Sequence, residues 1–255
     1  MSNYEIITTV LSIIAIALSI LIPLSQWIWK KWVVRGKLKY YPVGQATLFF
    51  NQSGSYVQVN GVLESINKSI SVRKMCVVIR RQKDNKELNL TWAHLISPVN
   101  QSLVGKYMRT IEAAHPFRID SDSIMCAFTE FSDPFDSFGK TFRNSSVELF
   151  KNAKQSPIFQ SLYSDAESTY TKSIEYAKVK QIANNEFFWE IGKYSLDIVI
   201  NYNNSRKVFS YTFSVAEQEY NELKHNIDES LLAPLKCCYN ERLDFRSVFV
   251  ELSEQ

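Results

Sequence analysis

The feature that most constrains this chain is an uncharged, apolar stretch of about 23 residues near the N-terminus. It runs from Ile6 to Ile28 and reads IITTVLSIIAIALSILIPLSQWI. An α-helix rises about 1.5 Å per residue, so this stretch is long enough to cross a hydrocarbon core of about 30 Å with some tilt. Trp27, Trp29 and Trp32 crowd its C-terminal end, where amphipathic rings favour the membrane interface. The sequence therefore predicts one transmembrane helix.

The charges on either side of the stretch predict its orientation. The residues before it include no Lys or Arg, whereas five basic residues follow it: Lys30, Lys31, Arg35, Lys37 and Lys39. Basic residues are enriched on the cytoplasmic side of a membrane, so we expect the N-terminus outside and everything after residue 30 in the cytoplasm. A cleaved signal peptide carries its basic residues before the apolar run, so we expect this helix to be retained. Residues 1–36 then form the anchor and a basic juxtamembrane segment that contacts anionic membrane lipid.

Small and polar residues recur along one face of the predicted helix. They are spaced three or four apart, which keeps them on one side: Thr8, Ser12, Ala15, Ser19, Pro23 and Gln26. Two interpretations stay open. In the first, the hydroxyls bond carbonyls of their own helix and an isolated anchor tolerates them. In the second, several copies associate along this face, as a tight bundle or as a ring whose polar side lines a pore.

The remaining residues, 37–255, suffice for one large domain or two small ones. Of the whole chain, 45% is hydrophobic and 22% charged, which is ordinary for a folded protein, and the net charge of +3 gives no strong nucleic-acid signature. The four cysteines, with the three histidines, lack the spacing of a zinc site: Cys76, Cys126, Cys237 and Cys238. We therefore expect no metal, no cofactor, and free, buried or half-buried thiols in a reducing compartment.

Short alternating segments predict a mainly β domain. We expect strands at 38–41, 46–50, 56–62, 72–81, 88–96, 117–120, 124–131, 194–202, 207–213 and 245–252. Residues 51–54 predict a turn, those at 83–86 and 203–205 predict hairpins, and 65–69 reads as a loop. With Trp92 in the core, the pattern of the first half resembles an immunoglobulin-like sandwich that lacks the paired cysteines of antibody domains.

Two regions of this domain are expected to be helical. Between about 140 and 185, apolar residues recur at steps near four and predict a helical insertion in the sandwich: Ile158, Leu162, Ala166, Tyr170, Ile174 and Ala177. A later helix is predicted to start at Ser214, which has Glu217 at capping-box spacing, and to carry Tyr220, Leu223, Ile227 and Leu231 on one face. The expected fold class is α+β, with one transmembrane helix and a cytoplasmic, mainly β domain.

The sequence contains none of the common catalytic motifs. Phosphate-binding loops, dinucleotide fingerprints, zinc-protease motifs and nucleophile elbows are all missing from it, so we expect no enzyme. An enzyme with an unrecognised site is the third-ranked alternative. Five acidic residues could hold a cation through oxygen ligands, but their surroundings read as turns: Asp120, Asp122, Glu130, Asp133 and Asp136.

Basic residues cluster along one predicted strand and its hairpin. The candidate ligand-binding residues are Arg73, Lys74, Arg80, Arg81 and Lys83, with Lys86 nearby. On an alternating strand Arg73 and Arg81 share one side, and Lys74 and Arg80 share another. A phosphate-bearing ligand needs such donors. A solvated sheet edge, whose charges discourage aggregation, is the competing interpretation.

In outline the chain resembles the single-pass membrane effectors of bacterial anti-phage defence, both the Hailong type, held by DNA oligomers, and the CBASS type, driven by nucleotides. The resemblance is carried by the polar-striped span Thr8–Gln26, the basic exit Lys30–Lys39 and the β domain without an enzyme motif. It implies a homo-oligomer in the bacterial inner membrane. It also implies a nucleotide or short nucleic-acid ligand made by a partner protein, and helices that form a pore or disrupt the bilayer. The alternative is a passive membrane-tethered adaptor that binds a protein partner.

Overall fold

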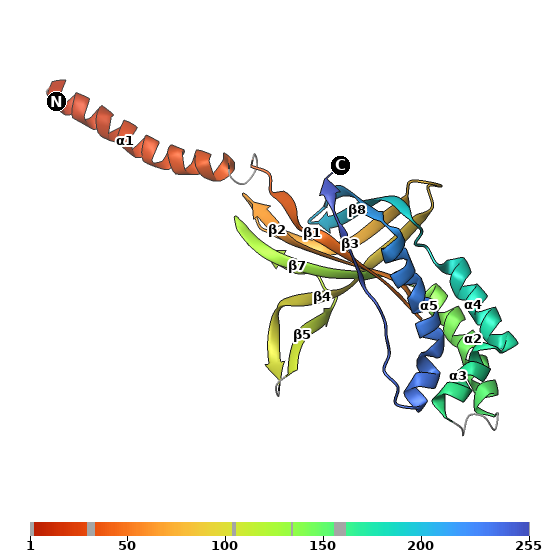
Figure 1. Cartoon of the computed structure of the whole chain (residues 1–255). Helices are drawn as coiled ribbons and strands as arrows, with labels where there is room; N and C mark the ends of the chain where they lie inside the picture. The colour runs from red at the N-terminus through yellow and green to blue at the C-terminus, as the bar shows by residue number, and fades with distance from the viewer. Residues whose placement is uncertain (1–2, 30–33, 104–105, 134, 156–161, 255) are drawn as a thin grey trace.

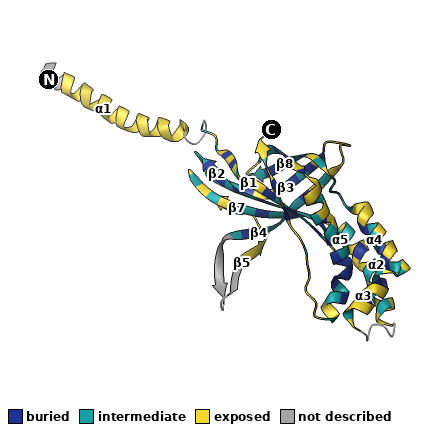
Figure 2. Ribbon diagram, in the orientation of Figure 1, coloured by how far each residue is buried: buried dark blue, intermediate teal, exposed yellow. Residues whose placement is uncertain are grey.

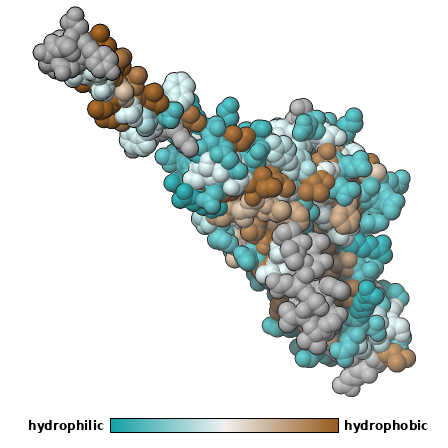
Figure 3. Space-filling model, turned by 90° about the vertical axis from the view of Figure 1, so that its left-hand side faces the viewer, coloured by the Kyte–Doolittle hydropathy of each residue, from teal (hydrophilic) through white to brown (hydrophobic). Residues whose placement is uncertain are grey.

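The N-terminal helix stands apart from a C-terminal domain of strands and helices (Figure 1). The computed structural model describes residues 3–29, 34–103, 106–133, 135–155 and 162–254. Helix α1, Asn3–Ile28, is exposed at every residue from 7 onward, and its surface is largely hydrophobic (Figures 2 and 3). It is long and apolar enough to cross a membrane, as the sequence predicted.

Within the described residues, eleven strands form one mostly antiparallel sheet. They are β1 (Lys37–Asn51), β2 (Gly54–Ile66), β3 (Ile70–Arg81), β4 (Glu87–Leu103), β5 (Lys106–Ala113), β6 (Phe117–Ile119), β7 (Ser123–Ser132), β8 (Gly192–Tyr202), β9 (Ser205–Val215), β10 (Val248–Glu251) and β11 (Ser253–Glu254). Their order is β10-β1-β2-β7-β4-β3-β8-β9-β11, with β5 added to β4 and β6 to β3. Only Leu252 separates β10 from β11, so the last few residues pair with both β1 and β9.

The sheet is therefore nearly closed, and the predicted immunoglobulin-like sandwich is not confirmed. The α+β class with mainly antiparallel strands is confirmed. Closure depends on a strand from the extreme C-terminus, and alternation within single segments does not say which strands become neighbours.

The interior of the sheet follows the alternation of the sequence. Val57 and Val59 of β2 point inward with at most 1% exposure. Gly61 continues the inward row because the ring of Tyr40 lies over it, where any Cβ would collide with that ring. Trp92 belongs to the core as predicted, and Trp189 is buried more completely still.

Two strand boundaries differ from the prediction for physical reasons. The segments expected at 38–41 and 46–50 form one strand, because the β1–β2 register shifts between Pro42 and Ala46, where Gly44 adopts a left-handed φ of 85°. Strand β5 was not predicted, and β4 continues past the expected end at residue 96. Strand β5 pairs with β4, and its residues 110–113 are exposed, with Ile111 62% exposed, so this part of the strand shows no buried apolar row.

The helical insertion is confirmed, but the described residues form three helices in place of one. These are α2 (Ser137–Lys154), α3 (Tyr163–Thr171) and α4 (Ile174–Glu186), which pack with α5 (Glu217–Cys238) around a second core (Figure 1). The expected spacing fails after Tyr170, because Ser173 caps a new helix by accepting a hydrogen bond from the Tyr176 N–H at 3.1 Å. Consequently Ile174 is exposed and Tyr176 buried. Ile158 lies outside the described residues.

Helix α5 begins later than its predicted capping box. Ser214 remains paired with Lys193 in the β8–β9 ladder, so it cannot cap a helix, and that prediction is wrong. Instead the Glu219 carboxylate accepts a hydrogen bond from the Ala216 N–H at 2.9 Å. The predicted inward face is confirmed, with Leu223 almost fully buried in the core.

Helix α5 also holds the chain that leads into β10. Asn226 is fully buried, and its amide donates to the Arg246 carbonyl at 2.7 Å and accepts from the Arg246 N–H at 2.8 Å. Glu229 accepts from the Asp244 N–H and from Lys236, both at 2.7 Å. These hydrogen bonds fix residues 244–246, which belong to no helix or strand. They thereby place β10 and β11 at the open side of the sheet.

Candidate functional site

The polar residues of α1 satisfy part of their hydrogen bonding within the helix. Ser12 donates to the Thr8 carbonyl at 2.8 Å, and Ser19 donates to the Ile16 carbonyl at 2.7 Å. This is the arrangement that the isolated-anchor interpretation expects. Each hydroxyl oxygen nevertheless keeps acceptor capacity for a neighbouring helix. Ala15, Pro23 and Gln26 complete the stripe on the same exposed helix, so both interpretations remain open.

A bulge in β3 rearranges the predicted basic cluster. The β3–β8 register shifts between Val72 and Lys74, and Arg73 and Lys74 are both exposed. Alternation resumes afterwards, so that Arg81 points inward while Arg80 points outward. The expectation that Arg73 and Arg81 share a side is therefore wrong, because the bulge adds a residue between them.

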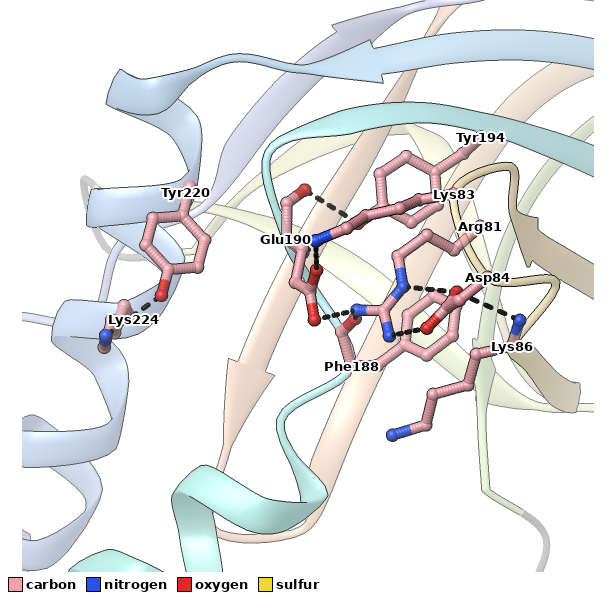
Figure 4. A network of polar contacts seen from close by, with 9 residues as sticks. All are labelled: Arg81, Lys83, Asp84, Lys86, Phe188, Glu190, Tyr194, Tyr220 and Lys224. Carbon is pink, nitrogen blue, oxygen red and sulfur yellow. Dashed lines mark hydrogen bonds and ion pairs between the residues drawn. The ribbon is translucent and has the colours of Figure 1, made fainter.

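Arg81 has a structural role, because its guanidinium is buried among hydrogen-bond and ion-pair partners (Figure 4). Its side chain is 6% exposed and donates to both carboxylate oxygens of Asp84, at 2.6 and 2.9 Å. It also forms an ion pair with Glu190 at 2.7 Å and donates to the Phe188 carbonyl at 3.0 Å. The hydrogen bond from Arg81 is the main cause that lowers the pKa of Asp84 to about 2. Arg81 thus ties the β3–β4 hairpin to the segment before β8.

Two more candidates of the cluster also pair with carboxylates. Arg80 lies 2.6 Å from Glu87, and Lys83 lies 3.4 Å from Glu190. Both pairs are well exposed, so they contribute little to stability. Of the five candidates, Arg73 and Lys74 alone form no ion pair with a carboxylate in the described part of the chain.

Arg73 and Lys74 line a small cavity at a gap in the sheet. Strand β4 pairs with β3 only as far as Thr91 opposite Cys76, and then continues alongside β7. The cavity, of about 290 Å³, lies where the two strands separate. We call it the sheet-gap pocket, and its lining includes Arg73, Lys74, Thr91, Trp92 and His115.

The imidazole of His115 can offer an acceptor to this pocket. Its Nδ1 lies 3.0 Å from the Ala113 carbonyl oxygen. A carbonyl only accepts, so Nδ1 carries the proton and Nε2 of the neutral ring is an acceptor. The pocket therefore combines two cations, a hydroxyl and an imidazole.

A larger hollow of about 600 Å³ lies on the outer face of the sheet, and the sequence did not predict it. The register aligns Thr47, Gln58, Glu130 and His94 in one row across β1, β2, β7 and β4. We call it the outer groove, lined by these four with Phe49, Asn51, Tyr56, Asn60, Ser247 and Phe249. The alternation of residues along β2 does place Tyr56, Gln58 and Asn60 on one side of the sheet. The groove residues of the other strands lie beside them only because of how the strands pair.

The chemistry of the outer groove disfavours a phosphate. Glu130 lies 2.9 Å from His94, and the described lining holds no Lys or Arg. Burial is the main cause that raises the pKa of Tyr56, so its hydroxyl stays protonated and uncharged near neutral pH. Rings, amides and one carboxylate suit an uncharged or cationic group better than a phosphate.

Comparison with protein families, with curated proteins and with solved structures found no match to this chain.

The described residues contain no group of three or more His, Cys, Asp or Glu side chains that could hold a metal ion. Acidic residues of the stretch 120–136 act locally, since Asp133 accepts from the N–H groups of Phe135 and Ser137 at 2.9 Å. The four cysteines are free thiols as predicted, but Cys126, Cys237 and Cys238 are exposed, where burial had been expected.

Proposed function

We propose that this chain is an oligomeric membrane effector of the bacterial inner membrane, acting in anti-phage defence. Helix α1 spans the bilayer with its N-terminus outside, and the C-terminal domain lies in the cytoplasm. The domain senses a nucleotide or short nucleic acid made by a partner protein. Ligand binding allows the α1 helices of several copies to form a pore or disrupt the membrane.

The observation that carries the proposal is the pair of uncompensated cations at the sheet-gap pocket. Arg73 and Lys74 are adjacent and exposed because of the bulge, while Arg80, Arg81 and Lys83 pair with carboxylates. Charge-assisted hydrogen bonds from Arg and Lys to phosphate are strong, and Arg presents a planar fork that matches phosphate oxygens. A cavity of about 290 Å³ holds a phosphate and part of its sugar, and leaves the remainder of a ligand outside.

The composition of the helix supports association of copies. Pro23 has no N–H, so it cannot donate to the Ser19 carbonyl one turn earlier. An unpaired backbone carbonyl is costly in hydrocarbon, and a donor on a neighbouring helix relieves that cost. The Ser19 carbonyl and the Ser19 hydroxyl lie together on the polar stripe. Association along the stripe thus offers partners that lipid does not.

We expect the double change Arg73→Gln and Lys74→Gln to weaken ligand binding about 100-fold. Two hydrogen bonds from charged groups, at about 1.5 kcal/mol each, account for this loss. The measurement is fluorescence polarisation of the full chain in detergent with labelled adenine nucleotides and short DNA oligomers. The matched control is Arg80→Gln with Lys83→Gln, which removes two paired cations from the same hairpin and is expected to change affinity less than twofold. Equal losses in both variants would refute the pocket.

Inducible expression is expected to depolarise the host membrane, and Ser12→Leu with Ser19→Leu is expected to abolish the effect. The two leucines remove hydroxyls and add bulk at the proposed contact face. A voltage-sensitive dye measures the potential, and Ile14→Leu with Leu21→Ile is the control away from the stripe. An unchanged potential at high expression, with or without candidate ligand, would reject the effector.

A passive tethered adaptor is the second candidate, and two observations favour it. The Ser12 and Ser19 hydroxyls already have partners in their own helix. The outer groove offers rings and amides to a protein side chain and needs no phosphate. In this case a protein partner binds the domain, and α1 only holds it at the membrane.

A further inference from the structure

Basic residues from separate segments meet at the end of the sheet where β1 begins. This end comprises the start of β1, the β2–β3 loop, the segment around β6 and the β8–β9 turn. We call it the basic rim, and its cations are Arg35, Lys37, Lys68, Arg118, Arg206 and Lys207.

Strand register and hydrogen bonds fix these segments beside one another. Lys37 pairs with Ile66 at the end of β2, and Ile70 at the start of β3 pairs with Ile119 of β6. The β8–β9 turn joins the rim through Asn203, whose side-chain oxygen accepts from the Ser71 N–H at 3.1 Å.

One hydrogen bond joins β1 and β9, two strands that are not neighbours in the strand order of the sheet. The Lys207 ammonium at the start of β9 donates to the Leu38 carbonyl at the start of β1, at 2.6 Å. This hydrogen bond brings the start of β9 against the start of β1, so Lys207 joins the other basic segments at this end of the sheet.

The rim has an excess of positive charge. Its six cations face two carboxylates, Asp120 and Asp122, and the Arg118–Asp120 pair is loose, at 3.8 Å between highly exposed side chains. In the described part of the chain, Lys37 and Arg206 form no ion pair and are exposed. The whole chain carries a net charge of only +3, so positive charge is concentrated at this end.

The covalent link to α1 keeps the rim near the membrane surface. Eight residues lie between Ile28, the end of α1, and Lys37, the start of β1. Even fully extended, they reach about 30 Å, and the Val34 N–H to Trp29 carbonyl hydrogen bond shortens that reach. The linker itself carries Lys30, Lys31 and Arg35, so it is also drawn to an anionic surface.

We propose that the basic rim docks on the headgroups of anionic lipids in the leaflet where α1 ends, so that the sheet stands on the membrane by this end. Lipid phosphates accept hydrogen bonds from the Lys and Arg side chains. The inference rests on the membrane-spanning part of the proposed function, and it requires neither a nucleotide ligand nor a pore.

Hydrogen–deuterium exchange of the full chain in nanodiscs tests the rim directly. One nanodisc contains phosphatidylcholine alone, and the other also contains phosphatidylglycerol. We expect the amides of the turns at 67–69, 120–122 and 203–204 to exchange at least about fivefold more slowly with the anionic lipid at low salt. Each cation contributes about fivefold to attraction by an anionic surface, and salt screens it, so the protection should disappear at high salt.

Matched variants separate docking from a general charge effect. Lys37→Gln, Arg118→Gln and Arg206→Gln together should abolish the lipid-dependent protection. The control is Lys86→Gln, Lys140→Gln and Lys193→Gln, which removes three exposed cations outside the rim and should retain it. Equal exchange in the two nanodiscs, or full protection in the rim variant, would overturn the proposal.

Separate measurements on the same protein test the membrane anchor and the ligand site. Extraction of the chain from membranes by carbonate would overturn both the anchor and the rim. Resistance to carbonate without lipid-dependent protection would overturn the rim alone. The rim variant keeps Arg73 and Lys74, so its nucleotide binding reports on the effector proposal independently.

Discussion

Replacing Arg81 with methionine is expected to lower the free energy of unfolding by about 2 kcal/mol. Methionine retains most of the buried volume, so the loss reports mainly on the hydrogen bonds to Asp84, Glu190 and the Phe188 carbonyl. The two carboxylates are more than 40% exposed and regain water when the guanidinium is gone, which keeps the penalty below that of a fully buried ion pair. Urea unfolding of the full chain, followed by tryptophan fluorescence, measures the change.

The same substitution should alter how stability responds to acid. The pKa of Asp84 falls from 3.8 to about 2 in the folded protein, mainly through its hydrogen bond with Arg81. A lowered carboxyl pKa contributes stability that is fully present above about pH 4 and is lost as pH falls through about 2. The wild-type chain should therefore lose stability over this window, and the Arg81→Met chain should lack that component. An unchanged acid profile in the variant would contradict the role of this pair.

Arg80 supplies the matched control for Arg81. It is the preceding residue of the same strand, has a 44% exposed side chain and pairs with a single exposed carboxylate, Glu87. Arg80→Met is expected to leave the free energy of unfolding nearly unchanged. If Arg81→Met and Arg80→Met lowered the free energy of unfolding equally, the burial of Arg81 would add nothing to stability.

The two arginines show which properties of β3 could be read from the sequence. Alternation correctly predicted a strand with a buried centre around Val77 and Ile79. It could not locate the bulge at Arg73 and Lys74, because a bulge depends on how the neighbouring strand pairs. The composition of the basic cluster was evident, but its division into paired and unpaired cations depends on Asp84, Glu87 and Glu190.

Features that depend on strand pairing over long distances in the sequence could not be predicted, for a similar reason. The turn at 51–54 and the hairpins at 83–86 and 203–205 were predictable, because their turn residues are local. The outer groove was not predictable, since its row of side chains joins residues as distant as Thr47 and Glu130. Closure of the sheet is also non-local, and it is the property with the largest expected effect on stability.

Replacing Val250 with aspartate is expected to destabilise the protein by about 4 kcal/mol, a large share of the stability of an ordinary domain. Val250 is 4% exposed and pairs with Ala46 of β1, in the short strand that brings β1 and β9 into one nearly closed sheet. A charge there either is buried without a partner or pulls β10 away from β1. Urea unfolding should show a lower midpoint, and hydrogen exchange should rise at Gln45–Leu48, which pair with β10.

Phe249→Asp is the control that separates loss of sheet closure from the mere presence of a new charge in β10. Phe249 is the preceding residue of the same strand, yet it is 64% exposed because it points outward into the outer groove. The same new charge at this position meets water, so we expect a loss below about 1 kcal/mol and no faster exchange at Gln45–Leu48. Similar losses at both positions would mean that β10 tolerates no charge on either side. A loss confined to Val250→Asp would show that the C-terminal strand closes the core, because only its inward residues would then be sensitive.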